Sequence, residues 1–325
     1  MTINWGIIGC GDVCEIKSGP AFYKIEGSTL TAVMRRDGNK AADFAKRHGV
    51  KSAYTTTEEL LADTNVNAVY VATPPHLHKQ YTIQALKAGK TVYVEKPMAL
   101  NYAECEEMIK VANENNQKLF VAYYRRSLPY FEKVKELIDK EFIGKPVAVE
   151  VKQFRSPFGS DFEADTQTWR VKSDVAGGGY FYDLAPHTID ILDFLLGKIT
   201  DAKGFSANLG GLYRTEDTVS ACFQFESGVL GTGLWSFVTE SKSNIDSVEI
   251  LGTKGKISFA IFDFIPIKLI TSEGIQEFEI GNPQHIQQPL IETIVKELSG
   301  KGYCPSPATS GTRTSWVIDK IFGKL

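Results

Sequence analysis

The sequence predicts an α/β protein of two domains, and three observations lead to this prediction. The length of 325 residues suits two domains of ordinary size. Short β-rich segments alternate with helical patterns from residue 3 to about residue 121, which is typical of parallel βαβ units. In the second half, strand-like segments follow one another closely. We therefore expect a doubly wound parallel sheet in residues 1–122, and an α+β domain with a large open, mainly antiparallel sheet in residues 123–325.

The first domain is expected to consist of short apolar strands, each followed by a helix, joined by right-handed crossovers. The strands are predicted at Ile3–Ile8, Thr29–Met34, Ala68–Ala72, Thr91–Val94 and Lys118–Val121. The helices are predicted at Gly19–Lys24, Asn39–His48, Thr57–Leu61, Leu77–Ala88 and Tyr102–Asn115.

The pattern changes after Pro129, where a helix at Tyr130–Asp139 leads into a strand at Val147–Phe154. Glycine-containing turns at 225–228 and 252–255 indicate hairpins. The further strands are predicted at Asp217–Glu226, Val229–Val238, Ser247–Leu251, Lys256–Ala260, Ile267–Thr271 and Gln276–Ile280. Two closing helices, Ile286–Leu298 and Thr312–Phe322, are expected to pack back toward the first domain.

Composition excludes several classes of partner. A net charge of −3 gives no electrostatic reason to bind nucleic acid or an anionic membrane. No apolar segment approaches the roughly 20 residues that span a bilayer, and the N-terminus reads as a core strand, not a signal peptide. The five cysteines form no C-x-x-C pair, which favours a reduced, cytoplasmic protein without a metal site.

A glycine motif, G-C-G-D-V-C, follows the first predicted strand directly. Glycines at this place permit a tight turn and a close approach of the backbone to a pyrophosphate. Cys14 stands at the third position of G-x-G-x-x-G, which mainly serves helix–strand packing. We predict a Rossmann-type dinucleotide site that includes Gly9, Gly11, Asp12 and Val13, with an ordinary tight turn as the alternative.

Two arginines, Arg35 and Arg36, follow the second strand and precede Asp37. An acid here usually binds the ribose hydroxyl of NAD, whereas an arginine accommodates the extra phosphate of NADP. Because a guanidinium suits a phosphate, we favour NADP over NAD. Two alternatives stay open: Asp37 turns inward and binds the ribose hydroxyl, or the two arginines belong to a solvated loop.

Two further segments follow predicted parallel strands, at the sheet edge where a dinucleotide binds. One contains Thr73, Pro74 and His78, and the other Glu95 and Lys96. A lysine at that edge can stabilise the alkoxide that develops during hydride transfer. We predict that these five residues contact the cofactor; helix-start packing for His78 and a surface charge for Lys96 are the alternatives.

The segment G-G-G-Y-F-Y-D-L-A-P-H-T-I-D at 177–190 places Asp183, His187 and Asp190 at i, i+4 and i+7, on one face of a helix. Polar groups beside so apolar a surface need partners, and proton transfer is one reason to keep them. Asp190 is equally well explained as a cap or an ion-pair partner.

With E-K-P at 95–97 and GGG-x-x-x-D-x-x-x-H-x-x-D at 177–190, the chain resembles the glucose–fructose oxidoreductase/inositol dehydrogenase (Gfo/Idh/MocA) family over essentially its whole length. The resemblance implies an N-terminal Rossmann domain and a C-terminal domain whose sheet often forms the subunit interface, hence a homodimer or homotetramer. It also implies hydride transfer between a nicotinamide cofactor and a hydroxyl or carbonyl of a sugar, cyclitol or related polyol.

The resemblance assigns roles to individual residues. Lys96 lies beside nicotinamide and substrate, Asp183 binds or orients the reacting group, and His187 donates or accepts the proton. The residues expected to bind substrate are Tyr124, Arg126, Trp169, Arg170, Asp183 and His187. For Trp169 and Arg170, a core tryptophan with a surface arginine is an equally good explanation. Arg35 stands where NAD-dependent members commonly carry an acid.

Three other functions stay open. A glycoside hydrolase on the same fold uses a tightly held NAD transiently. A dihydrodiol-type dehydrogenase acts on a non-sugar substrate. A non-catalytic dinucleotide-binding regulator is less well supported, because Lys96, Asp183 and His187 are all present.

Overall fold

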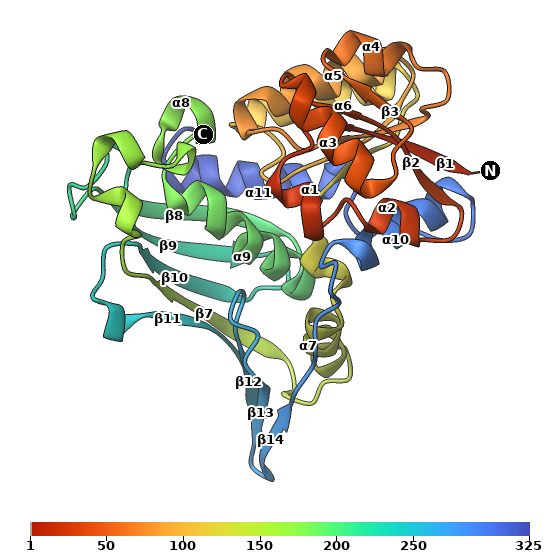
Figure 1. Cartoon of the computed structure of the whole chain (residues 1–325). Helices are drawn as coiled ribbons and strands as arrows, with labels where there is room; N and C mark the ends of the chain where they lie inside the picture. The colour runs from red at the N-terminus through yellow and green to blue at the C-terminus, as the bar shows by residue number, and fades with distance from the viewer. Residues whose placement is uncertain (1) are drawn as a thin grey trace. The chain divides into compact units, whose positions relative to one another are not determined.

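The computed structural model describes residues 2–325, which form two compact units (Figure 1). The first unit comprises the chain up to Leu128 together with Pro283–Thr312, and the second comprises Pro129–Asn282 and Arg313–Leu325. The sequence predicts a second domain that runs from residue 123 to the C-terminus and includes both closing helices. In the structure, the first of these two helices belongs to the first unit.

The first unit contains a six-stranded sheet with the order β3-β2-β1-β4-β5-β6, in which every neighbouring pair is parallel. This confirms the predicted doubly wound fold. The strands are β1 (Ile3–Ile8), β2 (Ser28–Met34), β3 (Ser52–Tyr54), β4 (Ala68–Val71), β5 (Thr91–Val94) and β6 (Leu119–Val121). The sequence analysis missed β3, an edge strand of only three residues without a buried side chain.

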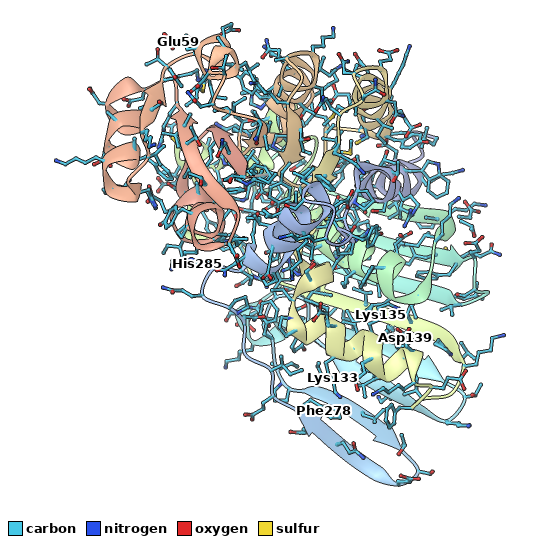
Figure 2. All side chains as sticks on the ribbon, turned by 90° about the vertical axis from the view of Figure 1, so that its right-hand side faces the viewer. Glu59, Lys133, Lys135, Asp139, Phe278 and His285 are labelled. Atoms are coloured by element: carbon cyan, nitrogen blue, oxygen red, sulfur yellow. The ribbon has the colours of Figure 1, made fainter. Side chains whose placement is uncertain are left out.

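Side-chain caps fix where several helices of this unit begin. Asp37 caps α3, Asn101 caps α6, and Thr56 with Glu59 forms a capping box on α4 (Glu59 is labelled in Figure 2). The helices are α1 (Asp12–Ile16), α2 (Ala21–Lys24), α3 (Gly38–His48), α4 (Thr57–Ala62), α5 (His78–Lys87), α6 (Tyr102–Glu114) and α10 (Gln288–Leu298), with 3₁₀ turns η1 (Pro75–Leu77) and η2 (Tyr124–Ser127).

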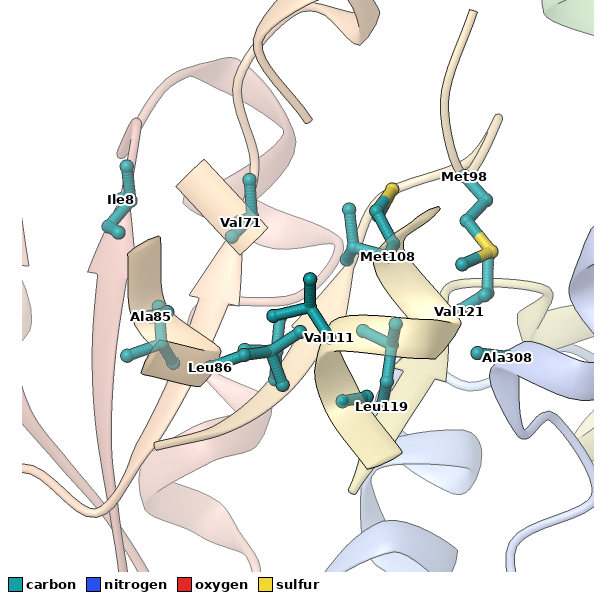
Figure 3. Packing of buried hydrophobic residues seen from close by; sticks show 14 of the residues in the cluster. Ile8, Val71, Ala85, Leu86, Met98, Met108, Val111, Leu119, Val121 and Ala308 are labelled. Carbon is teal, nitrogen blue, oxygen red and sulfur yellow. The ribbon is translucent and has the colours of Figure 1, made fainter. Parts of the chain in front are cut away.

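One hydrophobic cluster of the first unit lies between the sheet and α5 and α6 (Figure 3). Val71 and Val121 from the strands, Leu86 from α5 and Met108 from α6 are all fully buried. Each such side chain stabilises the fold by about 1.5–3 kcal/mol.

Polar contacts attach the segment before α10 to this unit. His285, labelled in Figure 2, lies 2.7 Å from Lys24 Nζ through one ring nitrogen, and 2.7 Å from the carbonyl oxygen of Ile16 through the other. The backbone N–H of Gln287 donates to the carbonyl oxygen of Lys17 at 3.1 Å. The C-terminal segment is therefore anchored beside the loop that follows α1.

The second unit contains an eight-stranded sheet with the order β14-β13-β12-β11-β7-β10-β9-β8. Only β7 and β10 pair in parallel, which confirms the predicted, mainly antiparallel sheet. The strands are β7 (Pro146–Phe154), β8 (Ile199–Ala207), β9 (Thr218–Phe225), β10 (Leu230–Ser236), β11 (Ile245–Gly252), β12 (Gly255–Phe259), β13 (Ile267–Thr271) and β14 (Gly274–Phe278). The sequence analysis missed β8, an edge strand with only two buried residues, Ile199 and Ala202.

One face of this sheet is covered by α7 and α9 (Figure 1). Phe181 of α9 meets the buried ring of Trp235 edge-on at 5.2 Å, and Lys133 of α7 lies 4.6 Å from the ring centre of Phe278 (Figure 2). The helices are α7 (Pro129–Asp139), α8 (Ser173–Ala176) and α9 (Tyr180–Leu196), with 3₁₀ turns η3 (Gly159–Asp161), η4 (Ala164–Thr166), η5 (Trp169–Val171) and η6 (Ser241–Ser243). Helix α11 (Ala308–Ile321) begins in the first unit and belongs to the second from Arg313 onward. Within residues 2–325, no helix has the length and apolar character that crossing a membrane requires.

Candidate active site

The turn after β1 requires glycine at Gly9 for reasons internal to the chain. Its φ of +87° is a left-handed conformation, and a Cβ there would lie 2.7 Å from Thr73 Cγ2. At Gly11 a Cβ would meet no described atom closer than the Gly9 carbonyl oxygen, at 3.8 Å. The fold itself therefore does not demand the second glycine, whereas a ligand that approaches the backbone there would.

A pocket of about 330 Å³ opens at the carboxyl ends of β1, β2 and β4. It is lined by Gly9, Gly11, Met34, Arg35, Arg36, Asp37, Lys40, Ala72, Thr73, Pro74, Leu77 and Tyr81. The structure thus brings together six predicted cofactor residues, both glycines, both arginines, Thr73 and Pro74, around one cavity. The sequence analysis missed Lys40 and Tyr81, because both lie within predicted helices and carry no motif.

The basic rim of this pocket includes Arg35, Arg36 and Lys40. Arg35 Nη1 donates to the carbonyl oxygen of Cys10 at 3.2 Å, which holds the guanidinium beside the glycine turn. The Asp37 carboxylate accepts from the backbone N–H of Lys40 at 3.2 Å as the cap of α3, and it lies 3.8 Å from Lys40 Nζ. The rim thus carries three cationic side chains and one carboxylate, which already caps a helix, and guanidinium groups bind phosphates well.

Two cysteines of the glycine motif are packing residues. Burial raises the pKa of Cys10 to about 11, against the opposing charge of Arg35, and it raises the pKa of the fully buried Cys14 still further. Both thiols therefore stay protonated at neutral pH. The neighbouring Asp12 and Val13 begin α1, where Asp12 is exposed.

His78 lies behind the pocket instead of lining it. Its ring is fully buried, with Nδ1 2.8 Å from the carbonyl oxygen of Pro97 and Nε2 2.7 Å from that of Thr73. Burial lowers the pKa of His78, although both carbonyls act in the opposite direction. The ring joins the loop after β4 to the loop after β5.

Glu95 supports the backbone of Lys96. Its buried carboxylate accepts from the Tyr70 hydroxyl at 2.5 Å, from Gln287 Nε2 at 2.6 Å and from the Lys96 N–H at 3.0 Å. Burial, with Glu95 adding to it, raises the pKa of Tyr70 well above its usual range, so this phenol remains a donor. Lys96 itself is half-buried, and the peptide bond to Pro97 is cis.

The predicted substrate residues Tyr124 and Arg126 lie in η2 of the first unit, and both are buried. Arg126 Nη1 donates to the carbonyl oxygen of Pro305 at 2.8 Å and to Ser310 Oγ at 2.9 Å. Arg126 therefore anchors the C-terminal segment of this unit, a task that its sequence position did not indicate.

In the second unit, the glycines before α9 allow the helix to begin against the segment before β9. A Cβ at Gly179 would lie 2.6 Å from Thr215 Oγ1 and 2.8 Å from the carbonyl oxygen of Glu216. The helix carries Asp183, His187 and Asp190, with the side chain of Asp183 14% exposed. His187 and Asp190 are buried.

A second pocket, of about 350 Å³, lies beside the start of α9. It is lined by Arg155, Phe158, Ser160, Thr168, Arg170, Tyr180, Asp183 and Leu184. Arg170 Nε donates to Asp183 Oδ2 at 2.9 Å, and its guanidinium lies 4.7 Å from the ring centre of Trp169. The structure thus joins three predicted substrate residues, Asp183, Arg170 and Trp169, whereas Arg155 was not predicted.

His187 has an aromatic neighbour that the sequence did not indicate. Phe262 meets its ring edge-on at 5.7 Å. Lys96 belongs to the first unit, and His187 and Asp183 belong to the second. In residues 2–325, no group of three or more His, Cys, Asp or Glu side chains is arranged to hold a metal ion.

Two family models match most of the chain. Residues 3–123 match the model of an oxidoreductase family with an NAD-binding Rossmann fold, and residues 131–258 match the GFO/IDH/MocA C-terminal domain. The chain belongs to the Gfo/Idh/MocA family. As a member, it is an NAD(P)-dependent dehydrogenase or reductase.

Similar proteins support this assignment. Oxidoreductase P35 of Formosa agariphila is 39% identical over 99% of this chain and 98% of its own length. The 1,5-anhydro-D-fructose reductase of Ensifer adhaerens is 27% identical over 97% of this chain and 93% of its own. A levoglucosan dehydrogenase in complex with NADH and levoglucosan is 21% identical, with a TM-score of 0.87 over 99% of this chain and 97% of that one. The last similarity shows the Gfo/Idh/MocA fold.

Proposed function

We propose that the protein transfers hydride between NADP(H) and a hydroxyl or carbonyl of a sugar, cyclitol or related polyol. The observation that carries the cofactor preference is the basic rim of Arg35, Arg36 and Lys40 around a pocket at the glycine turn. The substrate class is supported by the similarity to a 1,5-anhydro-D-fructose reductase and by a polar pocket at Asp183.

In this proposal Lys96 and His187 both act on the substrate oxygen. A bound nicotinamide supplies the hydride acceptor or donor. His187 takes the hydroxyl proton onto its imidazole during oxidation and returns it during reduction. Lys96 donates to the developing oxyanion and stabilises it. Asp183, held by Arg170 Nε at 2.9 Å, accepts from a substrate hydroxyl and orients the reacting carbon.

Turnover of a panel of sugars, cyclitols and polyols, followed by nicotinamide absorbance, tests the reaction. We expect Lys96→Ala and His187→Ala each to lower kcat by about 10²–10⁴-fold, the usual range for proton transfer and oxyanion groups, with NADPH affinity largely kept. Retained turnover in either variant would contradict its assigned role. The panel should also contain aryl glycosides and an aromatic dihydrodiol. Glycoside cleavage without net nicotinamide turnover would indicate a glycoside hydrolase. Selective oxidation of the dihydrodiol would indicate a dihydrodiol-type dehydrogenase.

Titration with NADPH and NADH, followed by nicotinamide fluorescence, tests the cofactor preference. Because charge-assisted hydrogen bonds to phosphate are lost, we expect Arg35→Asp to weaken NADPH binding by about 30-fold and NADH binding by less than about 3-fold. Lys51→Asp, at an exposed position outside the pocket, is the charge-matched control and should change neither. Equal losses for both cofactors in Arg35→Asp would remove the preference for NADP.

We further propose a homodimer or homotetramer formed through the sheet face opposite α7 and α9. That face exposes Phe205 on β8, at 87%, together with Leu230 and Leu234 on β10. Exposed apolar side chains on a large sheet favour cover by a second copy. Light scattering at micromolar concentration should show the oligomer, and Phe205→Asp should weaken it; a monomer in the wild type would contradict the proposal.

We also propose a cytoplasmic location. None of the five cysteines forms a disulfide bond and four of them are buried, which supports this location.

A further inference from the structure

Two guanidinium groups face one pocket in the second unit. Arg155 follows β7, Arg170 lies in η5, and both line the cavity of about 350 Å³ beside Asp183. Asp183 is the only carboxylate in this described lining. The pocket therefore carries more positive than negative charge.

Arg170 is only partly used by its own chain. It donates through Nε to Asp183, and its plane lies 4.7 Å from the ring centre of Trp169. A guanidinium has five N–H donors in a rigid fork. The contact through Nε leaves both terminal nitrogens available to another acceptor, while the aromatic ring fixes the plane of the group.

Arg155 has a weak counter-ion. Its nearest carboxylate is Asp263, with 3.7 Å between Arg155 Nη2 and Asp263 Oδ1, well beyond the 2.7–2.9 Å of a charge-assisted hydrogen bond. The guanidinium instead lies 5.1 Å from the ring centre of Phe262. Burial and the neighbouring Asp246 raise the pKa of Asp263, whereas Arg155 acts in the opposite direction.

The segment that holds Arg155 in place is itself rigidly anchored. The carboxylate of Asp246 accepts from the backbone N–H groups of Ile261 at 3.2 Å, Phe262 at 2.5 Å and Asp263 at 3.0 Å. Because Phe262 also contacts His187, this loop connects the position of Arg155 to the proposed proton carrier.

The rest of the lining suits a sugar ring that carries an acidic substituent. Thr168 Oγ1 accepts from the Arg170 N–H at 3.1 Å, so its own proton is free to be donated. Ser160 adds a second hydroxyl, and Phe158, half exposed, adds a flat apolar surface with Leu184 beside it.

We propose that Arg155 and Arg170 bind an anionic substituent of the substrate, so that the protein acts on sugars that bear a carboxylate or a phosphate. This inference rests on the proposed function, because Asp183 belongs to both sites. Two guanidinium forks recognise either oxyanion, and the hydroxyls of Thr168 and Ser160 complete the set of donors.

Steady-state kinetics with matched substrates test the inference. The panel contains D-glucose, D-glucuronate and D-glucose 6-phosphate, and the corresponding galactose set. We expect kcat/KM for an acidic sugar to exceed that of its neutral partner by about 10-fold or more, as expected for charge-assisted hydrogen bonds. The uronates and the phosphates identify which anion is preferred.

Variants of Arg155 test whether this side chain causes the preference for acidic sugars. Arg155→Gln should reduce the acidic-to-neutral ratio of kcat/KM to about one, and Arg155→Lys should restore part of it, because the charge is kept and only the fork is lost. Arg214→Gln, at an exposed position outside the pocket, removes the same charge and should leave the ratio unchanged. An unchanged ratio in Arg155→Gln, or an equal loss in Arg214→Gln, would overturn the inference.

Calorimetric titration with the same sugars separates this inference from the proposed function. Neutral sugars that turn over without any advantage of the acidic ones would remove the inference and leave the proposed function standing. Acidic sugars that bind in an Arg155-dependent manner without turnover would support the inference and remove the proposed function. Neither binding nor turnover of any acidic sugar would overturn the inference.

Discussion

The two units build their pockets in different ways. In the first, the cavity lies at the ends of β1, β2 and β4, and its shape comes from backbone turns, above all the left-handed Gly9. In the second, the cavity beside α9 is lined by side chains from the irregular segment between β7 and α8. The first pocket is thus a property of the sheet edge, and the second is a property of individual side chains.

This difference shows where each site is vulnerable. The shape of a backbone-built pocket tolerates side-chain changes but not an added Cβ at its closest approach. A pocket built from side chains depends on the ion pairs that hold its elements. In the second unit one such pair joins the buried Asp193 of α9 to the partly exposed Arg313 of α11. In the first unit the corresponding pairs, such as Glu15 with Arg47, lie at the surface.

The largest expected effect comes from breaking the buried pair of the second unit. The Asp193 carboxylate accepts from Arg313 Nε at 3.1 and 3.0 Å and from the Ile199 N–H at 3.1 Å. Asp193→Ala leaves a partly buried guanidinium without its partner, and we expect the free energy of unfolding to fall by about 3 kcal/mol. Urea unfolding measures this. Asp201→Ala, whose exposed carboxylate is 4.0 Å from Lys320, is the control and should cost less than about 0.5 kcal/mol; equal losses would contradict the contrast.

A smaller effect is expected from adding a methyl group to the glycine turn of the first unit. Gly9→Ala forces a side chain into a φ of +87° and against Thr73, and should cost about 2 kcal/mol of stability. Gly11→Ala meets no described atom within 3.8 Å and should cost less than about 1 kcal/mol, yet weaken NADPH binding by about 10-fold or more, because the methyl group occupies space needed by the ligand. Thermal unfolding and NADPH titration of both variants measure the two quantities. Unchanged NADPH affinity in Gly11→Ala would show that the open space does not receive the cofactor.

The same contrast explains what the sequence could predict. Glycine spacing, strand ends and the arginines after β2 are local signals, so five of the six strands of the parallel sheet and six of the residues that line its pocket were predictable. The face of α9 that carries Asp183 and His187 followed from helical periodicity alone. These features require only that neighbouring residues adopt a regular conformation.

The missed residues depend on contacts between distant segments. Arg155 reaches the pocket because the chain after β7 folds back along α9, and no periodic pattern predicts that path. Lys40 joins the basic rim only because α3 begins beside β2. The anchoring role of Arg126 likewise requires the segment around Ser310, which is 184 residues away.

The surface pair of the first unit should contribute less, and in a pH-dependent way. Hydrogen bonds from Arg47, and then from His48, lower the pKa of Glu15 from 4.5 to about 2. Since the folded state lowers this pKa, the stabilisation is complete above about pH 4.5 and is lost as the pH falls toward 2. With the Glu15 side chain 34% exposed, screening leaves about 0.5–1 kcal/mol, which Glu15→Gln should remove at pH 6 and not near pH 2. Urea unfolding at both pH values measures this difference. The control Glu58→Gln, at an exposed position on α4, should change the free energy of unfolding equally at both pH values. If Glu15→Gln lowers the free energy of unfolding equally at pH 6 and near pH 2, titration of Glu15 is not the cause of the loss.

The smallest effect is expected for an exposed pair in the second unit, which separates burial from membership of a unit. Lys135 and Asp139 lie four residues apart on α7 with 2.9 Å between Nζ and Oδ1 (Figure 2). Asp139 also stands in the last turn, where a negative charge opposes the helix dipole and offsets the pair. Asp139→Ala should therefore change stability by less than about 0.5 kcal/mol, and 1 M salt should abolish the difference. A loss comparable to that of Asp193→Ala would mean that the second unit depends on all its ion pairs, whereas a negligible loss would attribute the sensitivity to the burial of Asp193.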